Sequence, residues 1–211
     1  MTIIIDGTTG VPVSPVTGTL AVANGGTGVT TSTGSGANVL GTSPSISGAV
    51  MTTMASSVIT SGTAQASTSG TSIDFTSIPS WVKRITVMFQ GVSSSGTSDY
   101  LVRLGSGSPT TTGYLTASVN TSGASSTTTN NTTGFVIPSG GASAVFNGVA
   151  CFCTLGSNAW AGSGILAQSD TTRAISFSGS ISLGGTLDRV RITTVNGTDT
   201  FDAGSINILY E

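Results

Sequence analysis

Histidine is absent from this sequence of 211 residues, and lysine occurs only once, as Lys83. Ser-His-Asp and Cys-His nucleophilic sites both need an imidazole base, so both kinds of active site are excluded. A phosphate-binding P-loop needs a Gly-Lys pair, and this sequence has none. We therefore expect no catalytic residue in this chain.

Charge is also scarce. Charged residues make up 7% of the chain, with six basic side chains, eight acidic ones and a net charge of -2, whereas about 25% is usual for soluble domains. The basic residues are too dispersed to form the positive stripe that follows a phosphate backbone, so nucleic acid is not an expected partner. No apolar run approaches the ~20 residues of a membrane-spanning helix, so we expect no membrane insertion.

Only two cysteines are present, Cys151 and Cys153, on either side of Phe152 in an apparent strand. Residues two apart in a strand share a face, and their spacing puts a disulfide out of reach without distortion. Two cysteines without histidine cannot complete a structural zinc site within one chain, which leaves a metal shared across a symmetry axis as the open alternative. We expect both thiols to be buried as small hydrophobic groups, with no metal and no cofactor.

Aromatic residues are missing from the first 74 positions, in which Asp6 and Asp74 are the only charges. A segment with so few large side chains cannot bury enough apolar area to offset the entropy of ordering it. Short apolar groups alternate there with Gly, Thr and Ser, without a Gly-X-Y period or a long heptad run. We assign residues 1–62 to an extended leader that attaches and spaces the molecule and is ordered by copies of itself or by a larger particle.

From about residue 63 the pattern becomes that of a folded domain. Ile85, Val87 and Phe89 alternate with Arg84 and Thr86, as in a half-buried strand. About nine short runs of this kind follow one another, separated by turns rich in Gly, Ser and Asn. They predict an all-β fold in which the extended leader precedes an antiparallel, jelly-roll-like β-sandwich head over residues 63–211.

Two segments resemble one known family. Asn24 to Thr31 reads Asn-Gly-Gly-Thr-Gly-Val-Thr-Thr and precedes Thr42-Ser43-Pro44, which looks like a repeat common in tail fibres of bacteriophages and prophages. Thr71 to Val87 is similar to the start of the C-terminal head of many such fibres. The resemblance implies a homotrimer whose heads touch the host surface. The chain is short for a long tail fibre, and we recognise no tail-adaptor domain before the repeat.

Three other features of the sequence could indicate catalysis, calcium binding or dinucleotide binding, and each also has a purely structural interpretation. Some phage spikes cleave polysaccharide with two carboxylates, but the carboxylates here are dispersed among strands and turns. The loop Asn196 to Asp202 has oxygen ligands suited to calcium, yet a solvated hairpin with an Asn-Gly turn is favoured. Gly162 to Ala167 matches G-x-G-x-x-A, and without a helix we interpret its glycines as relaxing a strand. The carboxylates considered are Asp74, Asp99, Asp170, Asp188, Asp199, Asp202 and Glu211.

Recognition of a host glycan usually combines a stacking aromatic ring with hydroxyl and amide groups. This criterion selects residues near the polar loop 120–133 and three of the aromatic residues. The candidate ligand-binding residues are Tyr100, Tyr114, Asn120, Asn130, Asn131 and Trp160. Most aromatic residues of a sandwich lie in its core, and we expect this of Trp81, Phe89, Phe146, Phe152 and Phe177.

These observations predict a non-enzymatic, trimeric phage virion fibre protein. Its C-terminal head would adhere to a glycan or protein of the host bacterial surface, and its leader would contact other virion proteins. The alternative is a capsid-decorating spike or cement protein, and a depolymerising spike is the third reading. Met1 to Gly7 lacks the basic region of a secretory signal, so we expect the protein in the host cytoplasm before assembly and on the tail or capsid surface of the virion afterwards.

Overall fold

The structure is a computed structural model that describes residues 59–211. The leader prediction falls on residues 1–62, so nearly all of it lies outside the described residues, including the motif from Asn24 to Thr31. Residues 60 and 61 already pair with the last strand. The first sheet therefore includes two residues that we had assigned to the leader.

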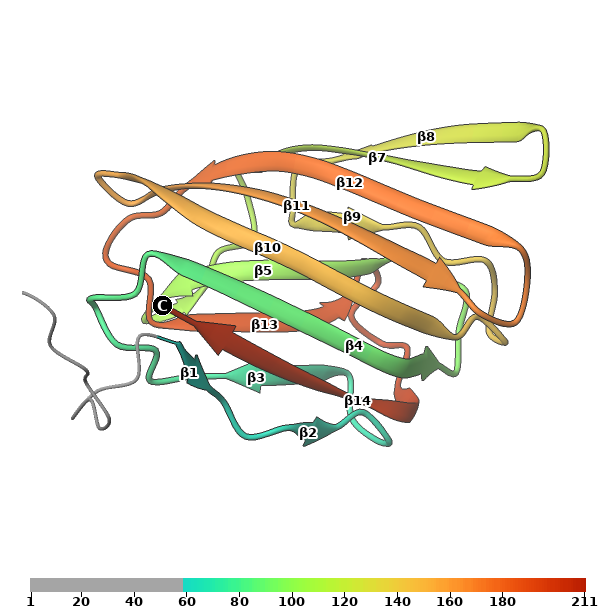
Figure 1. The fold of residues 1–211 in the computed structure, drawn as a ribbon, viewed down its shortest axis with the longest axis horizontal. Helices are drawn as coiled ribbons and strands as arrows, with labels where there is room; N and C mark the ends of the chain where they lie inside the picture. Colours follow the sequence, from blue (N-terminus) through green and yellow to red (C-terminus); the bar gives the residue numbers. More distant parts are fainter. Residues whose placement is uncertain (1–58) are drawn as a thin grey trace, which may run out of the picture. The chain divides into compact units, whose positions relative to one another are not determined.

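Two antiparallel sheets, without any helix, make up the described part of the chain (Figure 1). The larger one, sheet A, has nine strands in the order β1 (Thr60–Ser61), β14 (Phe201–Tyr210), β4 (Arg84–Ser94), β10 (Phe146–Gly156), β11 (Ala159–Gln168), β12 (Arg173–Ser182), β7 (Leu115–Ser122) and β8 (Ser125–Asn131), while β2 (Gln65–Ala66) pairs with β14. The smaller one, sheet B, has five strands in the order β3 (Ser72–Phe75), β13 (Arg189–Thr194), β5 (Tyr100–Ser106) and β6 (Ser108–Pro109), while β9 (Phe135–Ile137) pairs with β5.

The two sheets pack face to face through aromatic rings. Phe135 of β9 meets Phe152 of β10 with ring centroids 4.9 Å apart, and Tyr100 of β5 meets Phe146 of β10 at 5.1 Å. Both contacts join sheet B to sheet A, and both have the edge-to-face geometry that adds about 0.5–1.5 kcal/mol beyond area burial. The prediction of an antiparallel β-sandwich is confirmed.

Alternation along the strands decides which side chains enter the core. Ile85, Val87 and Phe89 of β4 are buried, whereas Arg84 is exposed, as the sequence pattern predicted. Neighbouring residues of a strand point to opposite faces, so β4, β10 and β12 each present apolar side chains to sheet B, whereas the buried positions of β7 are the polar residues Thr116, Ser118 and Asn120. The other face of sheet A points away from the core.

The glycines of β11 give the core rings room. A side chain on Gly162 would collide with the ring of Phe152, and one on Gly164 would collide with the ring of Phe177. The G-x-G-x-x-A match therefore has a structural cause, although the glycines admit aromatic rings rather than relax a bend.

Candidate functional site

The outward face of sheet A carries almost no charge. Residues directly opposite each other on neighbouring antiparallel strands point to the same face. One outward row crosses seven strands at Leu209, Thr86, Cys151, Ser163, Ser178, Ala117 and Asn130, and the next crosses them at Asn207, Met88, Val149, Ile165, Ser176, Val119 and Thr128. Neither row contains a charged residue, although outward sheet faces normally mix polar and charged groups.

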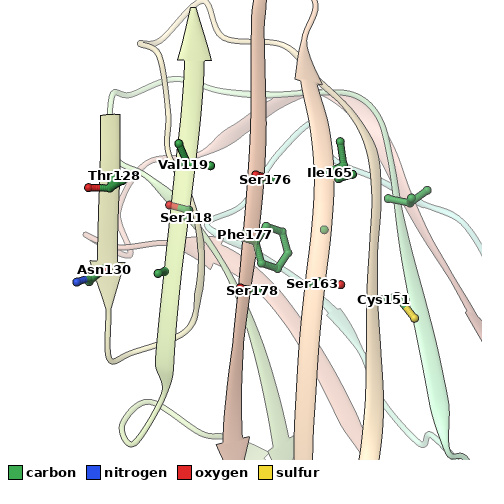
Figure 2. A pocket seen from close by; sticks show the side chains of 13 residues that line it. Ser118, Val119, Thr128, Asn130, Cys151, Ser163, Ile165, Ser176, Phe177 and Ser178 are labelled. Atoms are coloured by element: carbon green, nitrogen blue, oxygen red, sulfur yellow. The ribbon is translucent and has the colours of Figure 1, made fainter. Parts of the chain in front are cut away.

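A trough of about 820 Å³ lies on this face and extends from β8 across β7, β12 and β11 to β10 (Figure 2). Figure 2 shows Thr128 and Asn130 on one side of it, Cys151 on the other, and Ser163, Ser176 and Ser178 between them. The trough is lined by Ala117, Ser118, Val119, Thr128, Asn130, Val149, Cys151, Ser163, Gly164, Ile165, Ser176, Phe177 and Ser178.

The lining of the trough suits a ligand that is polar but uncharged. Serine and threonine hydroxyls each donate and accept hydrogen bonds, and the Asn130 amide does both. Ile165 is 70% exposed and Val149 is 51% exposed, so apolar contact surface lies beside these groups. An ionic ligand would lose hydration on entry without meeting an opposite charge. The combination of hydroxyl, amide and aliphatic groups matches the mixed surface of a neutral sugar.

The three candidate asparagines occupy different positions. Asn130 is exposed and lines the trough. Asn120 points toward the core side of β7 and is only 9% exposed. Asn131 is half-buried, and its Oδ1 accepts hydrogen bonds from the amide of Thr133 at 2.6 Å and from the Thr133 hydroxyl at 2.7 Å. The structure therefore places one of the three at the trough, while Asn131 stabilises the turn after β8.

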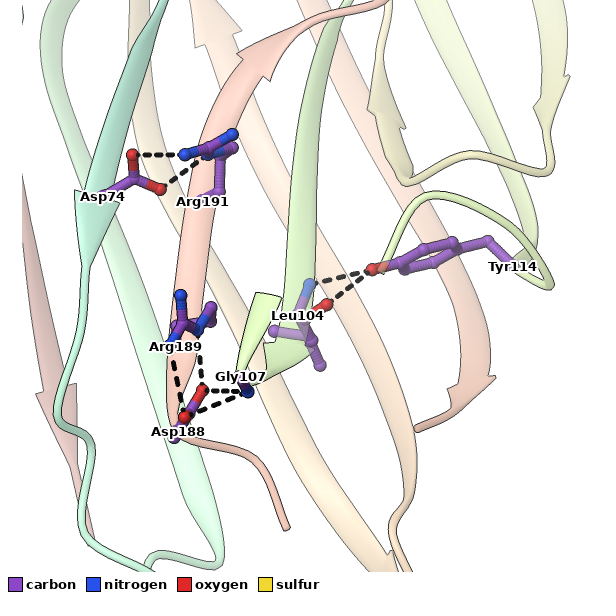
Figure 3. Close-up of polar contacts among 7 residues, drawn as sticks. All are labelled: Asp74, Leu104, Gly107, Tyr114, Asp188, Arg189 and Arg191. Atoms are coloured by element: carbon purple, nitrogen blue, oxygen red, sulfur yellow. Dashed lines mark hydrogen bonds and ion pairs between the residues drawn. The ribbon is translucent and has the colours of Figure 1, made fainter. Parts of the chain in front are cut away.

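The three candidate aromatic residues belong to the core. Tyr100, Tyr114 and Trp160 are 2%, 0% and 4% exposed, so their rings offer no face on which a sugar can stack. The Tyr114 hydroxyl accepts a hydrogen bond from the Leu104 amide at 2.8 Å and donates one to the Leu104 carbonyl at 3.1 Å (Figure 3). Burial raises the pKa of Tyr100 and of Tyr114 to about 12. We correct the prediction for these three residues and assign them to the core.

Trp81 departs from the prediction in the opposite direction, because it was expected in the core and is partly exposed. We expected it in the core with four phenylalanines, and Phe89, Phe146, Phe152 and Phe177 are indeed buried. Trp81 is 50% exposed, and its ring lies 5.9 Å from that of Tyr210. It precedes β4 in a turn rather than within a strand, so the alternation that buries its neighbours does not extend to it.

Several carboxylates are paired with arginine. Asp74 of β3 accepts two hydrogen bonds from Arg191 of β13, at 2.6 and 2.8 Å, and Asp188 accepts from both Arg189 and the Gly107 amide (Figure 3). The hydrogen bond from Arg189 lowers the pKa of the Asp188 carboxyl. A catalytic general acid needs a raised pKa instead.

The remaining carboxylates accept hydrogen bonds from nearby amides or a serine hydroxyl, or pair with an arginine. Asp99 accepts from the Ser139 amide, Asp170 from the Val145 amide, Asp199 from the Ser98 amide and Asp202 from the Ser93 hydroxyl, while Glu211 pairs with Arg84. Within residues 59–211, these groups form no cluster of three or more that is suited to a metal ion.

The loop from Asn196 to Asp202 uses its oxygens internally. Oδ1 of Asn196 accepts hydrogen bonds from the Thr194 hydroxyl and from the amides of Thr198 and Asp199. Gly197 has a positive φ of 68°, which fits the predicted Asn-Gly turn. The turn connects β13 of sheet B to β14 of sheet A, however, so it crosses between the sheets and does not form a hairpin.

Both thiols lie on the outward face of β10. Cys153 is exposed and Cys151 is partly exposed, so the prediction that they are buried is wrong. Ala150 and Phe152 take the inward positions instead. The prediction that the thiols share a face is confirmed, because their Sγ atoms are 3.8 Å apart. Partial desolvation by the neighbouring atoms, followed by the hydrogen bond with Cys151, raises the pKa of the Cys153 thiol.

Most trough residues were not among the sequence candidates. Ser163, Ser176 and Ser178 alternate with inward residues along β11 and β12, and the sequence pattern did not single them out. The signal that points to them is the lack of any charge at the outward positions of several strands. It becomes visible only when the strand order places those positions side by side.

Comparison of the chain with protein-family models, with curated protein sequences and with solved structures gave no match. Residues 59–211 contain no helix long and apolar enough to cross a membrane.

Proposed function

We propose that this chain is a non-enzymatic fibre protein of a bacteriophage virion, that it is trimeric, and that residues 59–211 form its adhesive head. The ligand of this head is a neutral glycan of the host bacterial surface, and it binds in the trough on the outward face of sheet A. The leader contacts other virion proteins. The resemblance of two segments to phage tail fibres supports the class of protein.

The uncharged trough is the observation that carries the adhesive role. It offers an open surface of hydroxyl, amide and aliphatic groups that extends over five strands of sheet A. Polar protein groups that bind sugar hydroxyls exchange hydrogen bonds with water, so each contact contributes only about 0.5–1.5 kcal/mol. Such a site is weak alone. Three sites on one particle multiply the affinity when a repetitive surface engages them together.

The trough can be tested with two serine substitutions on one strand. Ser176→Arg places a long charged side chain in the trough, whereas Ser182→Arg changes an exposed residue of β12 outside it. The full-length protein and both variants are applied to an array of neutral and acidic bacterial surface glycans. We expect the unchanged protein and Ser182→Arg to bind neutral glycans equally and Ser176→Arg to lose at least about tenfold in apparent affinity, roughly 1.4 kcal/mol. Equal binding by all three proteins contradicts the placement of the ligand in the trough.

The number of copies per virion distinguishes the fibre from the capsid-decorating alternative. A fibre occurs as a few trimers at the tail, whereas a decorating or cement protein covers the shell with hundreds of chains. Quantitative mass spectrometry of purified virions measures this number against the major capsid protein. We expect a few trimers, and hundreds of chains would replace the fibre proposal with the decorating one.

A further inference from the structure

The two cysteines of the chain form a dithiol on the outward face of sheet A. Cys151 and Cys153 occupy successive outward positions of β10, and their Sγ atoms are 3.8 Å apart. No other cysteine occurs in the sequence, and histidine is absent. These two residues are therefore the only thiols of the chain, and it offers no imidazole ligand.

The strand that carries them is held on both sides. β10 pairs with β4 and with β11, so Cys151 lies between Thr86 and Ser163, and Cys153 lies between Arg84 and Ala161. Cα atoms two residues apart in a strand are about 6.6–6.8 Å apart, at the upper limit for a disulfide, and a disulfide needs sulfurs about 2.05 Å apart. Because an interior strand cannot pucker without losing ladder hydrogen bonds, the dithiol form is the one that this position favours.

The separation of the sulfurs fits a bound cation. Two thiolates at about 2.3 Å from a tetrahedral zinc ion, with an angle near 109° between them, lie about 3.8 Å apart. The two thiols already have this separation in the folded chain. A cation would consequently find a chelating pair that needs no rearrangement of the strand.

We propose that Cys151 and Cys153 together bind one divalent thiophilic cation per chain, of the Zn²⁺ or Cd²⁺ type, in an open site with two protein ligands that differs from a closed, four-ligand structural zinc site. Each thiol loses its proton to solvent, so a divalent cation and two thiolates form a neutral unit with the release of two protons. Water occupies the other coordination positions, since residues 59–211 contain no third Cys, Asp or Glu grouped with the pair. The site is thus open on the side of the trough, which Cys151 also lines. This inference does not depend on the proposed function.

Cadmium titration of the full-length protein tests the site. The protein is reduced with a phosphine, freed of metal with a chelator, and titrated with Cd²⁺ while the ultraviolet thiolate-to-cadmium charge-transfer band is recorded. We expect the band to reach its plateau at one cation per chain and to disappear when excess Zn²⁺ is added. Cys151→Ser and Cys153→Ser should each weaken binding by at least about 100-fold, the upper end of what the loss of an outer-shell group costs.

A second variant separates chelation from the mere presence of two thiols. Cys153→Ser combined with Leu155→Cys keeps two thiols on β10, but it places them four residues apart instead of two. We expect this variant to bind as weakly as the single serine variants, and circular dichroism checks that all variants are folded. Tight binding by this variant or by a single serine variant overturns the proposal. A plateau at half a cation per chain also overturns it, because the cation then bridges two copies.

Discussion

Single residues fix how closely the core of this sandwich is packed. At Gly164 the ring of Phe177 lies against the backbone of β11, and the Ala150 side chain approaches within 3.0 Å of where a Cβ would stand. At Tyr114 a fully buried hydroxyl bonds to both backbone groups of Leu104. The missing side chain of Gly164 leaves room for the Phe177 ring, and the Tyr114 hydroxyl fits the backbone of Leu104. A small change there has a measurable cost.

Gly164→Ala should destabilise the protein. The added methyl group overlaps the Phe177 ring, and inserting an extra methyl or methylene into a packed core costs about 1–3 kcal/mol. Gly184→Ala is the matched control, because its Cβ has no neighbour within 4 Å, and it should leave stability unchanged or raise it by up to about 1 kcal/mol. Urea unfolding of the full-length protein measures both effects. Equal urea midpoints for the two variants would contradict the structure, because they would show that β11 accommodates a methyl group at residue 164.

Alkaline pH should lower the stability of the folded protein because two of its tyrosines are buried. Tyr100 and Tyr114 have a pKa of about 12 in the folded chain against 10.0 for a free phenol. The folded state therefore holds protons that the unfolded state releases between these values. The resulting stability is fully present below pH 10 and is lost as the pH rises through about 12.

Two measurements check this expectation. The phenolate absorbance should show that Tyr100 and Tyr114 remain protonated in the folded protein at a pH midway between 10 and 12. Urea unfolding at the same pH should give a lower stability than at about pH 9. Ionisation of Tyr100 and Tyr114 near pH 10, with the fold intact, would contradict their burial.

At the scale of elements, strand pairing is what assembles the outward face. β10, β11 and β12 follow one another as a meander, β7 and β8 extend it on one side, and β4 and β14 extend it on the other (Figure 1). The trough depends on this order because its lining comes from five strands. Sheet B relies instead on short strands, and β3 is one of its edges.

The ion pair between Asp74 and Arg191 helps to hold the edge strand β3 on β13. The two residues are directly opposite each other, and both side chains are about one third exposed. Partly exposed pairs typically contribute about 0.2–1 kcal/mol. A double-mutant cycle with Asp74→Asn, Arg191→Gln and the double variant, measured by urea unfolding, should give a coupling energy in this range that decreases at high salt. A coupling energy of zero at low salt would show that the ion pair does not stabilise the pairing of β3 with β13.

At the scale of the whole molecule, the proposed function requires several copies. The sequence assigns the leader to an assembly role because it has almost no large side chains, and weak binding in the trough becomes useful only when sites are multiplied. Both arguments concern the full-length chain. Both predict that each particle carries more than one chain.

The full-length protein should be a trimer in solution. Light scattering coupled to size-exclusion chromatography measures its mass, and we expect three times the chain mass of 20.7 kDa. The measurement is made at micromolar concentration and repeated after dilution. A monomer under these conditions excludes the trimeric fibre and leaves the trough as a single, weak binding site.

Local periodicity made the fold class predictable. The alternation of Ile85, Val87 and Phe89 with Arg84 is a property of the chain itself, since successive side chains of a strand point to opposite sides. For the same reason the shared face of Cys151 and Cys153 was predictable. The lack of histidine is likewise a property of the sequence alone, and it determines which nucleophilic sites this chain cannot form.

The sequence by itself determined that this chain forms strands and which residues share a face. Only the tertiary structure decided which face is buried, and that choice moved Tyr100, Tyr114 and Trp160 into the core and both cysteines to the surface. The physical reason is that a face becomes core when another sheet covers it. That covering is set by contacts between distant segments, such as Phe135 with Phe152. The trough has the same origin, because its uncharged residues become one surface only when five strands lie side by side.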